Sequence, residues 1–577
     1  MTGLARIKKN IVFVATGIVL ILVFVTNCRH ARYNHPEGVI EWDVKSYYAW
    51  LPAAFIYNDL SLEFRRENPD KFGDLIWPVE TPTGKQAIVT TMGMALLYSP
   101  FFFAAHTVAL STSYEADGYS RPYRVALTFS ALFYLLAGMY FLGRVLLTYF
   151  SRNITAFTLI SVTLGTNLFY YSSYEAPMSH AANFALIAAF LWITIRFYKA
   201  PSVKLVVYSG LLAGLITLIR PTNIIVLVIF FLWDTGSFKA FSERFSFFLK
   251  RWNWILLMAV AFILVWLPQF IYWHWVSGKI FYFSYGELGG RFFFNNPQIF
   301  NILFSIKKGW FVYTPLMFLA LSGILILLRK KHSLVPAISL FLILNIFILS
   351  SWWNWWYGGG FGLRSFIDSY AIMAVPLAAL LEYLTSQKKY IRVATLSAVT
   401  LIIMFNLFQT RQYVNNAIHW WWMNREAYRE TFLKLHPTER YWNLITIPDH
   451  DLARQGVYRE ISPEPEEKPA SEWRRSPSDE ELILWIVKSL HEDKEVMNQS
   501  AGNDADRQDG IRAEALQLLQ ERGREHYEKK WAISLIVNEI LESPEMTDYI
   551  RQKAEKNNIP FDSMLVTDAE WIFNNQR

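Results

Sequence analysis

The strongest constraint on this chain is a series of apolar stretches long enough to cross a bilayer. The first covers residues 11–25, and ten more follow at about 123–143, 154–171, 180–196, 203–219, 222–233, 254–275, 311–328, 334–350, 370–385 and 393–409. The stretch 222–233 is short, and we expect it to be one arm of a broken pair around Arg220-Pro221, where proline stops the helix. About 20 apolar residues in a helix span the hydrocarbon core. We therefore predict an all-α polytopic membrane protein with about 11 transmembrane helices, and up to 13.

Composition supports a membrane protein. Of the 577 residues, 53% are hydrophobic and only 18% are charged, whereas a soluble chain of this length would carry more charge. The basic residues are scattered at span ends and do not cluster on one face, so no nucleic-acid partner is expected. The single cysteine, Cys28, excludes an internal disulfide and a cysteine-based metal site.

Charge predicts the orientation of the chain. Arg6, Lys8 and Lys9 precede the first apolar stretch, and no small-residue cleavage site follows it, so we expect an uncleaved anchor with a cytoplasmic N-terminus. Short cytoplasmic loops are rich in Lys and Arg, and five loops qualify, near residues 144–152, 196–204, 239–251, 329–331 and 388–392. The remaining loops and everything after residue 410 are then periplasmic, on the outer face of a bacterial inner membrane.

The first periplasmic loop, residues 28–122, should contain interfacial helices. Residues 87–110 are apolar enough to span, but a crossing there would break the alternation of sides. Pro100 lies in the middle of this stretch and favours an interruption. We expect a re-entrant or interfacial helix.

The predicted outer loops hold most of the unusual polar residues. They are Glu41, Asp43, Tyr47, Glu175, His180, Arg220, Lys307, Lys308, Tyr357 and Arg364. The cations lie on the side where the charge rule expects few, and phosphate at the depth of a lipid headgroup would explain them. Arg220, between two apolar helices, is unfavourable without a partner or a function. Four glycines within residues 358–362 favour a turn that closely approaches a ligand or another backbone.

Structural explanations remain open for several of these residues. Asp43 could cap a surface helix over residues 44–51. The tryptophans of residues 352–356 could form an interfacial aromatic belt. Lys307 and Lys308 could contact lipid headgroups, and Glu175 with His180 could be a buried, satisfied pair.

Three local patterns carry a family resemblance. They are Asp43-x-x-x-Tyr47 after the first span, Glu175-x-Pro-x-x-His180, and Trp-x-Trp-Trp-Tyr-Gly-Gly-Gly-Phe-Gly-x-Arg364 before a late span. Over residues 1–410 the chain resembles the GT-C superfamily of glycosyltransferases that use polyprenyl-phosphate-linked sugars, near the protein mannosyltransferase and aminoarabinose-transferase branch. The first loop has Glu41 two residues before a single Asp43, unlike the adjacent Asp-Glu pair of the protein mannosyltransferases, which argues against a protein acceptor.

The resemblance implies an inverting transfer of a sugar from a polyprenyl-phosphate donor to an envelope acceptor hydroxyl on a glycan, lipid or protein. Asp43 would be the general base. Arg220, Arg364 and Lys307 or Lys308 would hold the phosphate charge. Glu41 and Glu175 would orient the acceptor or bind a divalent ion, although no constellation requires a metal or other cofactor. Tyr357 and the neighbouring tryptophans would stack on sugar or polyprene.

The chain after residue 410 changes in character. Residues 1–411 hold 34 Lys and Arg against 17 Asp and Glu, whereas residues 412–577 hold 21 against 31. We predict a periplasmic connector and Pro/Glu-rich linker over residues 411–477, and a small helical soluble domain over residues 478–577. Helices are expected at about 478–490, 511–529, 531–542 and 545–557, with a flexible loop over residues 498–510.

Two other classes of function fit parts of the pattern. A lipid or glycan transporter would place ionisable residues at mid-membrane and often shows repeated halves, whereas here the polar residues gather at one face and no internal repeat is visible. A non-catalytic membrane scaffold would tolerate neutralisation of Asp43. A lipid-linked oligosaccharide ligase is a third, closer alternative, although it usually depends on one large late periplasmic loop.

Overall fold

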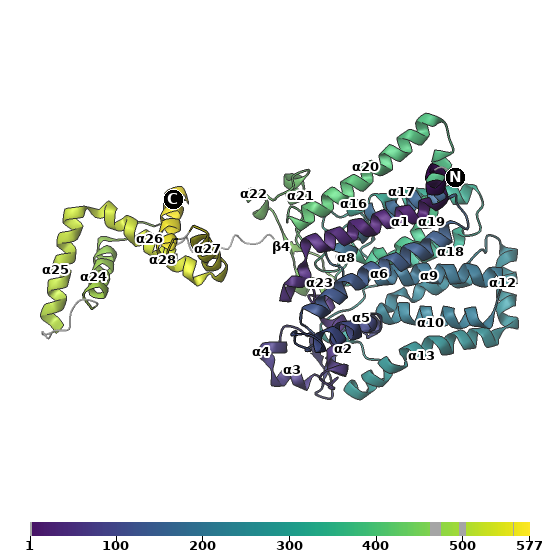
Figure 1. The fold of residues 1–577 in the computed structure, drawn as a ribbon, viewed down its shortest axis with the longest axis horizontal. Helices are drawn as coiled ribbons and strands as arrows, with labels where there is room; N and C mark the ends of the chain where they lie inside the picture. The colour runs from purple at the N-terminus through teal and green to yellow at the C-terminus, as the bar shows by residue number, and fades with distance from the viewer. Residues whose placement is uncertain (1–2, 462–472, 474, 496–503, 558, 577) are drawn as a thin grey trace. The chain divides into compact units, whose positions relative to one another are not determined.

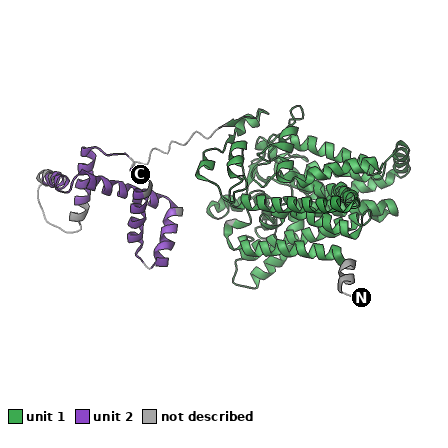
Figure 2. Ribbon diagram, turned by 90° about the horizontal axis from the view of Figure 1, so that it is seen from above, with its two compact units in different colours: residues 1–462 green, residues 463–577 purple. Residues whose placement is uncertain are grey.

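The computed structural model describes residues 3–461, 473, 475–495, 504–557 and 559–576. The chain divides into two compact units, Met1–Ser462 and Pro463–Arg577 (Figure 2). Each unit has its own hydrophobic core.

Unit 1 is a bundle of apolar helices (Figure 1). The helices at the predicted spans are α1 (Gly3–His30), α6 (Arg121–Leu146), α7 (Arg152–Leu164), α9 (His180–Lys199), α10 (Val203–Ile219), α11 (Val226–Leu232), α13 (Trp252–Ser277), α17 (Leu316–Arg329), α18 (Val335–Ser350), α19 (Tyr370–Thr385) and α20 (Lys389–Val414). Within the described residues, seven helices are long and apolar enough to cross a membrane, and four further apolar helices are shorter. The prediction of an all-α, multi-pass membrane protein is confirmed.

Two predicted spans are interrupted helices. The stretch 154–171 forms α7 and a short second helix, α8 (Leu168–Ser173), and the stretch 222–233 forms the 3-10 helix η3 (Pro221–Ile225) followed by α11. Pro221 explains the second break, because proline offers no backbone N–H to continue α10.

Glycines allow the helices of the bundle to approach closely. A Cβ on Gly210 of α10 would overlap the Met258 carbonyl of α13, and a Cβ on Gly323 of α17 would overlap the Pro376 carbonyl of α19. Small residues at such crossings bring helix backbones into van der Waals contact, which is a main source of helix association within lipid.

The two ends of the bundle differ in character. One end carries the N-terminus of the chain and α12 (Phe238–Lys250). The other end carries α2 (Asp43–Phe55), α3 (Glu63–Glu67) and α4 (Pro69–Phe72) (Figure 1). We refer to the second as the Asp43 end.

The loop between α1 and α6 is largely ordered. Besides α2 to α4 it contains the 3-10 helices η1 (Arg32–Asn34) and η2 (Pro36–Gly38), the antiparallel strands β1 (Pro78–Glu80) and β2 (Gln86–Ile88), and α5 (Gly93–Leu110). Lys71 pairs with Glu115 at 3.3 Å and with Asp117 at 3.9 Å, so the chain after α5 returns to the loop that precedes it. This geometry favours a re-entrant α5, although by length and composition α5 is also a candidate span; the re-entrant assignment stays a prediction.

The segment that follows α20 packs onto the Asp43 end. It contains α21 (Arg425–Thr431), α22 (Glu439–Trp442), β3 (Ile447–Pro448), α23 (His450–Ala453) and β4 (Glu460–Ile461). The Gln412 side chain donates to the carbonyls of Thr431 and Lys434, at 2.8 and 2.7 Å. The compact unit that contains the bundle extends to Ser462. Of residues 463–477, the Pro/Glu-rich part of the predicted linker, residues 463–472 and 474 lie outside the described residues.

Unit 2 is helical, with α24 (Asp479–Glu495), α25 (Asp504–Arg522), α26 (Arg524–Glu542), α27 (Pro544–Asn557) and α28 (Phe561–Gln576). Its core includes Ile486, Trp531, Ile536 and Leu565. The predicted helix over residues 511–529 belongs to two helices, because Gly523, with φ 83°, ends the helical conformation between α25 and α26. Of the predicted loop 498–510, residues 498–503 lie outside the described residues and the rest belongs to α25.

Candidate functional site

A cavity of ≈ 1610 Å³ lies at the Asp43 end. It is lined by the loop after α1, the turn before α9, the break between α10 and α11, the glycine-rich loop after α18 and the segment after α20. Seven predicted site residues line it, namely Glu41, Asp43, Tyr47, Glu175, Arg220, Tyr357 and Arg364. His180, Lys307 and Lys308 are not among the lining residues.

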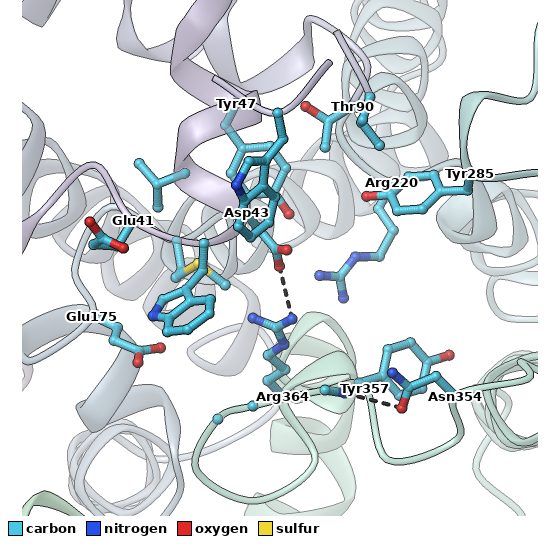
Figure 3. Close-up of a pocket in the computed structure, with 18 of the residues that line it drawn as sticks. Glu41, Asp43, Tyr47, Thr90, Glu175, Arg220, Tyr285, Asn354, Tyr357 and Arg364 are labelled. Carbon is cyan, nitrogen blue, oxygen red and sulfur yellow. Dashed lines mark hydrogen bonds and ion pairs between the residues drawn. The ribbon is translucent and has the colours of Figure 1, made fainter. Parts of the chain in front are cut away.

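Asp43 begins α2, and its carboxylate pairs with an arginine at the wall of the cavity (Figure 3). Its Oδ2 lies 2.8 Å from Nη2 of Arg364, and the two side chains are 29% and 15% exposed. Trp42 occupies the N-cap position of α2 and makes no side-chain capping hydrogen bond. The carboxylate of Asp43 is therefore directed to Arg364 and the cavity, and the alternative that it caps the helix is not supported.

The glycine-rich loop places Arg364 at the start of the 3-10 helix η4 (Arg364–Ser369). A Cβ on Gly359 would overlap the Trp420 ring, and one on Gly360 would overlap the Tyr171 hydroxyl. The backbone N–H of Phe361 donates to that hydroxyl at 2.9 Å. The predicted close approach at these glycines is present, and the partner is the protein's own aromatic side chains.

Arg220 points into the same space from the break between α10 and η3 (Figure 3). Its Nη1 lies 3.2 Å from Oδ2 of Asp368, a carboxylate that is only 4% exposed. The same oxygen accepts hydrogen bonds from Asn183 at 3.1 Å and Asn223 at 2.8 Å. Asp368 thus provides the partner that an arginine at this depth needs.

Asp368 is a functional candidate that the sequence reasoning missed. It follows Arg364 by four residues and lies outside the three local patterns. The available signal was an ionisable residue at the start of an otherwise apolar helix, which is unfavourable without a partner.

Glu175 and His180 do not form the pair that the sequence left open. The Glu175 carboxylate lines the cavity and accepts a hydrogen bond from the Tyr170 hydroxyl at 3.0 Å. Burial raises the pKa of Glu175, and Arg32 and Arg364 oppose this rise. His180 is fully buried, with Nδ1 3.8 Å from Oδ1 of Asp368. His180 therefore lies in the buried cluster around Asp368 and is not among the residues that line the cavity.

Lys307 and Lys308 are also not among the residues that line the cavity. The Lys307 amine lies 3.0 Å from Oε1 of Glu460, and its side chain is 3% exposed. The Lys308 amine donates to the carbonyl of Trp420 at 2.6 Å and to that of Gly360. Both lysines bind the segment after α20 to the bundle.

The environment of Lys308 predicts a pH-dependent stability. Burial, with a smaller contribution from Arg364, lowers the pKa of Lys308 to about 7 from 10.5. An unfolded chain then binds more protons at this group than the folded chain between these two values, so folding stability rises with pH across that window. We expect the wild type to gain stability over Lys308→Met when detergent-solubilised samples are unfolded at pH 9.5 instead of pH 7. An equal difference at both pH values would contradict this.

The site combines two guanidinium groups with a carboxylate at one wall of the cavity. Arginine offers a planar fork of donors that suits phosphate oxygens, and Asp43 is a candidate proton acceptor. Among the residues that the structure describes, no group of three His, Cys, Asp or Glu side chains is placed to hold a metal ion.

The comparisons with known proteins give structural likeness only. No family model and no curated protein matches the chain. Among solved structures, it is similar to the archaeal oligosaccharyltransferase AglB from Archaeoglobus fulgidus in complex with an inhibitory peptide and a dolichol-phosphate, with 12% identity and a TM-score of 0.41 over 83% of this chain and 60% of that one. It is also similar to the Archaeoglobus fulgidus oligosaccharyltransferase in the apo form, with 14% identity and a TM-score of 0.42 over 76% of this chain and 61% of that one.

A third solved structure is that oligosaccharyltransferase in complex with Zn and sulfate, with 14% identity and a TM-score of 0.37 over 82% of this chain and 56% of that one. The chain therefore spans about 60% of the length of these proteins.

Proposed function

We propose that this chain is an inverting glycosyltransferase that moves a sugar from a polyprenyl-phosphate donor to an acceptor hydroxyl. The observation that supports it most is the Asp43–Arg364 pair, 2.8 Å apart at the wall of a large cavity. A candidate base and a candidate phosphate ligand are in contact there, and the Arg220 guanidinium points into the same space (Figure 3). This is the minimum set that the reaction requires.

The donor phosphate takes Arg364 as its ligand and thereby frees the carboxylate of Asp43. Asp43 then accepts the proton of the acceptor hydroxyl while the hydroxyl oxygen attacks the anomeric carbon. The bond between that carbon and the phosphate oxygen breaks, and polyprenyl phosphate leaves with the electron pair. Attack from the face opposite the leaving group inverts the anomeric centre. Arg364 and Arg220 stabilise the charge on the departing phosphate.

We propose that the reaction takes place at the extracytoplasmic face. The opposite end of the bundle carries α12 with Lys239, Arg244 and Lys250, and short cytoplasmic loops are enriched in such residues. The Asp43 end then faces the periplasm of a bacterial inner membrane. Outer-leaflet lipids and envelope acceptors reach the cavity from that side.

The test is release of polyprenyl phosphate from polyprenyl-phosphate sugars by the purified full chain in the presence of an envelope extract. Wild type should release it, and Asp43→Asn should lose about 10²–10⁴-fold of the rate, the range for loss of a general base. Asp74→Asn is the matched control, because Asp74 is an exposed carboxylate of the same loop that does not line the cavity. Equal release by all three proteins would contradict the proposal.

A further inference from the structure

The residue before Asp43 holds an unusual backbone conformation. Trp42 has φ 50° and ψ −130°, a combination that is strained for a bulky L-residue. Its side chain is nonetheless 48% exposed and lines the cavity. Strain of this kind persists where the surrounding structure enforces it, and it clusters at ligand sites. A large aromatic ring is thus held exposed beside the candidate base.

Two further tryptophans approach Trp42. The Trp77 ring centroid lies 6.4 Å from that of Trp42 at an interplanar angle of 68°, and the Trp420 centroid lies 5.4 Å away at 37°. All three rings line the cavity. The three residues come from the start of α2, the strand-bearing part of the first loop and the segment after α20, so only the folded chain brings them together.

Contacts with other parts of the chain hold Trp420 and Trp77 in place. The Trp420 carbonyl accepts hydrogen bonds from the Lys308 amine at 2.6 Å and from the Gly360 N–H at 3.0 Å, and the Trp420 ring packs against Gly359. The Lys45 amine lies 5.8 Å from the Trp77 ring centroid and 3.7 Å from Oε2 of Glu41. The rings are therefore positioned before any ligand arrives.

We propose that Trp42, Trp77 and Trp420 form a subsite that binds one sugar ring next to Asp43. A pyranose presents a face of C–H groups that packs on an aromatic ring, and its hydroxyls need acceptors at the edge. The residues before and after Trp42 in the chain, Glu41 and Asp43, also line the cavity, and a few placed polar groups beside apolar walls are typical of small-ligand sites. The subsite deepens the proposed function, on which it rests, because the sugar belongs either to the donor or to the acceptor.

The direct test is saturation-transfer NMR of methyl glycosides of glucose, mannose, galactose, N-acetylglucosamine and arabinose with the detergent-solubilised full chain. At least one glycoside should bind wild type and bind Trp42→Ala at least tenfold more weakly. Trp442→Ala is the matched control, since Trp442 is 45% exposed but does not line the cavity. Failure of every glycoside to bind wild type, or equal binding to Trp42→Ala, would overturn the subsite.

A second pair of variants separates a binding role from a structural one. If Trp42 is kept in a strained conformation for binding, Trp42→Gly should unfold at a higher temperature than Trp42→Ala, because glycine adopts positive φ freely. Both should lose glycoside binding equally. Recovery of binding in Trp42→Gly would contradict the role of the ring.

Two further measurements identify the source of the sugar and isolate the subsite from the reaction. In Trp42→Phe, a raised KM for the polyprenyl-phosphate sugar alone assigns the ring to the donor, a raised KM for the acceptor alone assigns it to the acceptor, and no change in either contradicts the subsite. If wild type turns over no donor but still binds glycosides through Trp42, the transferase proposal fails and the subsite survives.

Discussion

Replacing Asp368 by leucine is expected to lower the free energy of unfolding by about 3–5 kcal/mol, the range for removing one partner of a buried ion pair. The change leaves the Arg220 guanidinium without its carboxylate, 3.2 Å away in the wild type, and removes the acceptor of Asn183 and Asn223. Denaturant unfolding of the detergent-solubilised protein measures the loss.

The double variant Arg220→Met/Asp368→Leu should recover much of this stability, because no buried charge is then left unpaired. The exposed pair between Arg454 and Asp451, at 3.0 Å, is the matched control, and Asp451→Leu should change stability by less than about 1 kcal/mol. A loss in Asp368→Leu no larger than in Asp451→Leu would show that Asp368 does not hold Arg220.

Replacing Arg364 by glutamine is expected to lower the rate of donor turnover by about 10²–10³-fold, the effect of losing one preorganised donor at a developing negative charge. The physical reason is that glutamine can hydrogen-bond a phosphate oxygen but cannot neutralise the charge that grows as the sugar departs. Single-turnover release of polyprenyl phosphate at saturating donor measures this step.

Arg454→Gln is the matched control for Arg364, because Arg454 also lines the cavity but pairs with the exposed Asp451. It should keep its turnover within a few-fold of the wild type. Equal losses in Arg364→Gln and Arg454→Gln would contradict a specific role for Arg364.

The architecture was predictable because bilayer length and loop charge are properties of the local sequence. The apolar stretches became helices, and α10 ends at Ile219, as Pro221 predicts, whereas the break within residues 154–171 was not predicted. Asp43, Arg220 and Arg364 could be expected to meet because each follows or precedes a span at the same predicted face. The cavity that they line together is described by the structure.

The pairing of charges could not be predicted. Lys308 and Arg364 carry the same signal in the sequence, a cation in a predicted outer loop, yet Lys308 donates to backbone carbonyls and Arg364 faces Asp43. The segment after α20 decides which of these cations is used in internal contacts, because it supplies the Trp420 carbonyl that Lys308 binds. That segment has a polar composition, but Trp420 packs on the glycine-rich loop, and composition alone placed it in a connector.

The strained backbone conformation of Trp42 could not be predicted from the sequence either. Nothing in the sequence around Trp42 indicates φ 50°, because the conformation results from how the loop after α1 enters α2. The aromatic group beside Asp43 therefore emerges only from the tertiary structure.

The most direct test of the account is a cryo-EM structure of the full chain with polyprenyl phosphate bound. The account predicts that the phosphate lies within hydrogen-bonding distance of the Arg364 and Arg220 guanidinium groups, and that Arg364 has left Asp43. A phosphate bound elsewhere, with the Asp43–Arg364 pair unchanged, would contradict it.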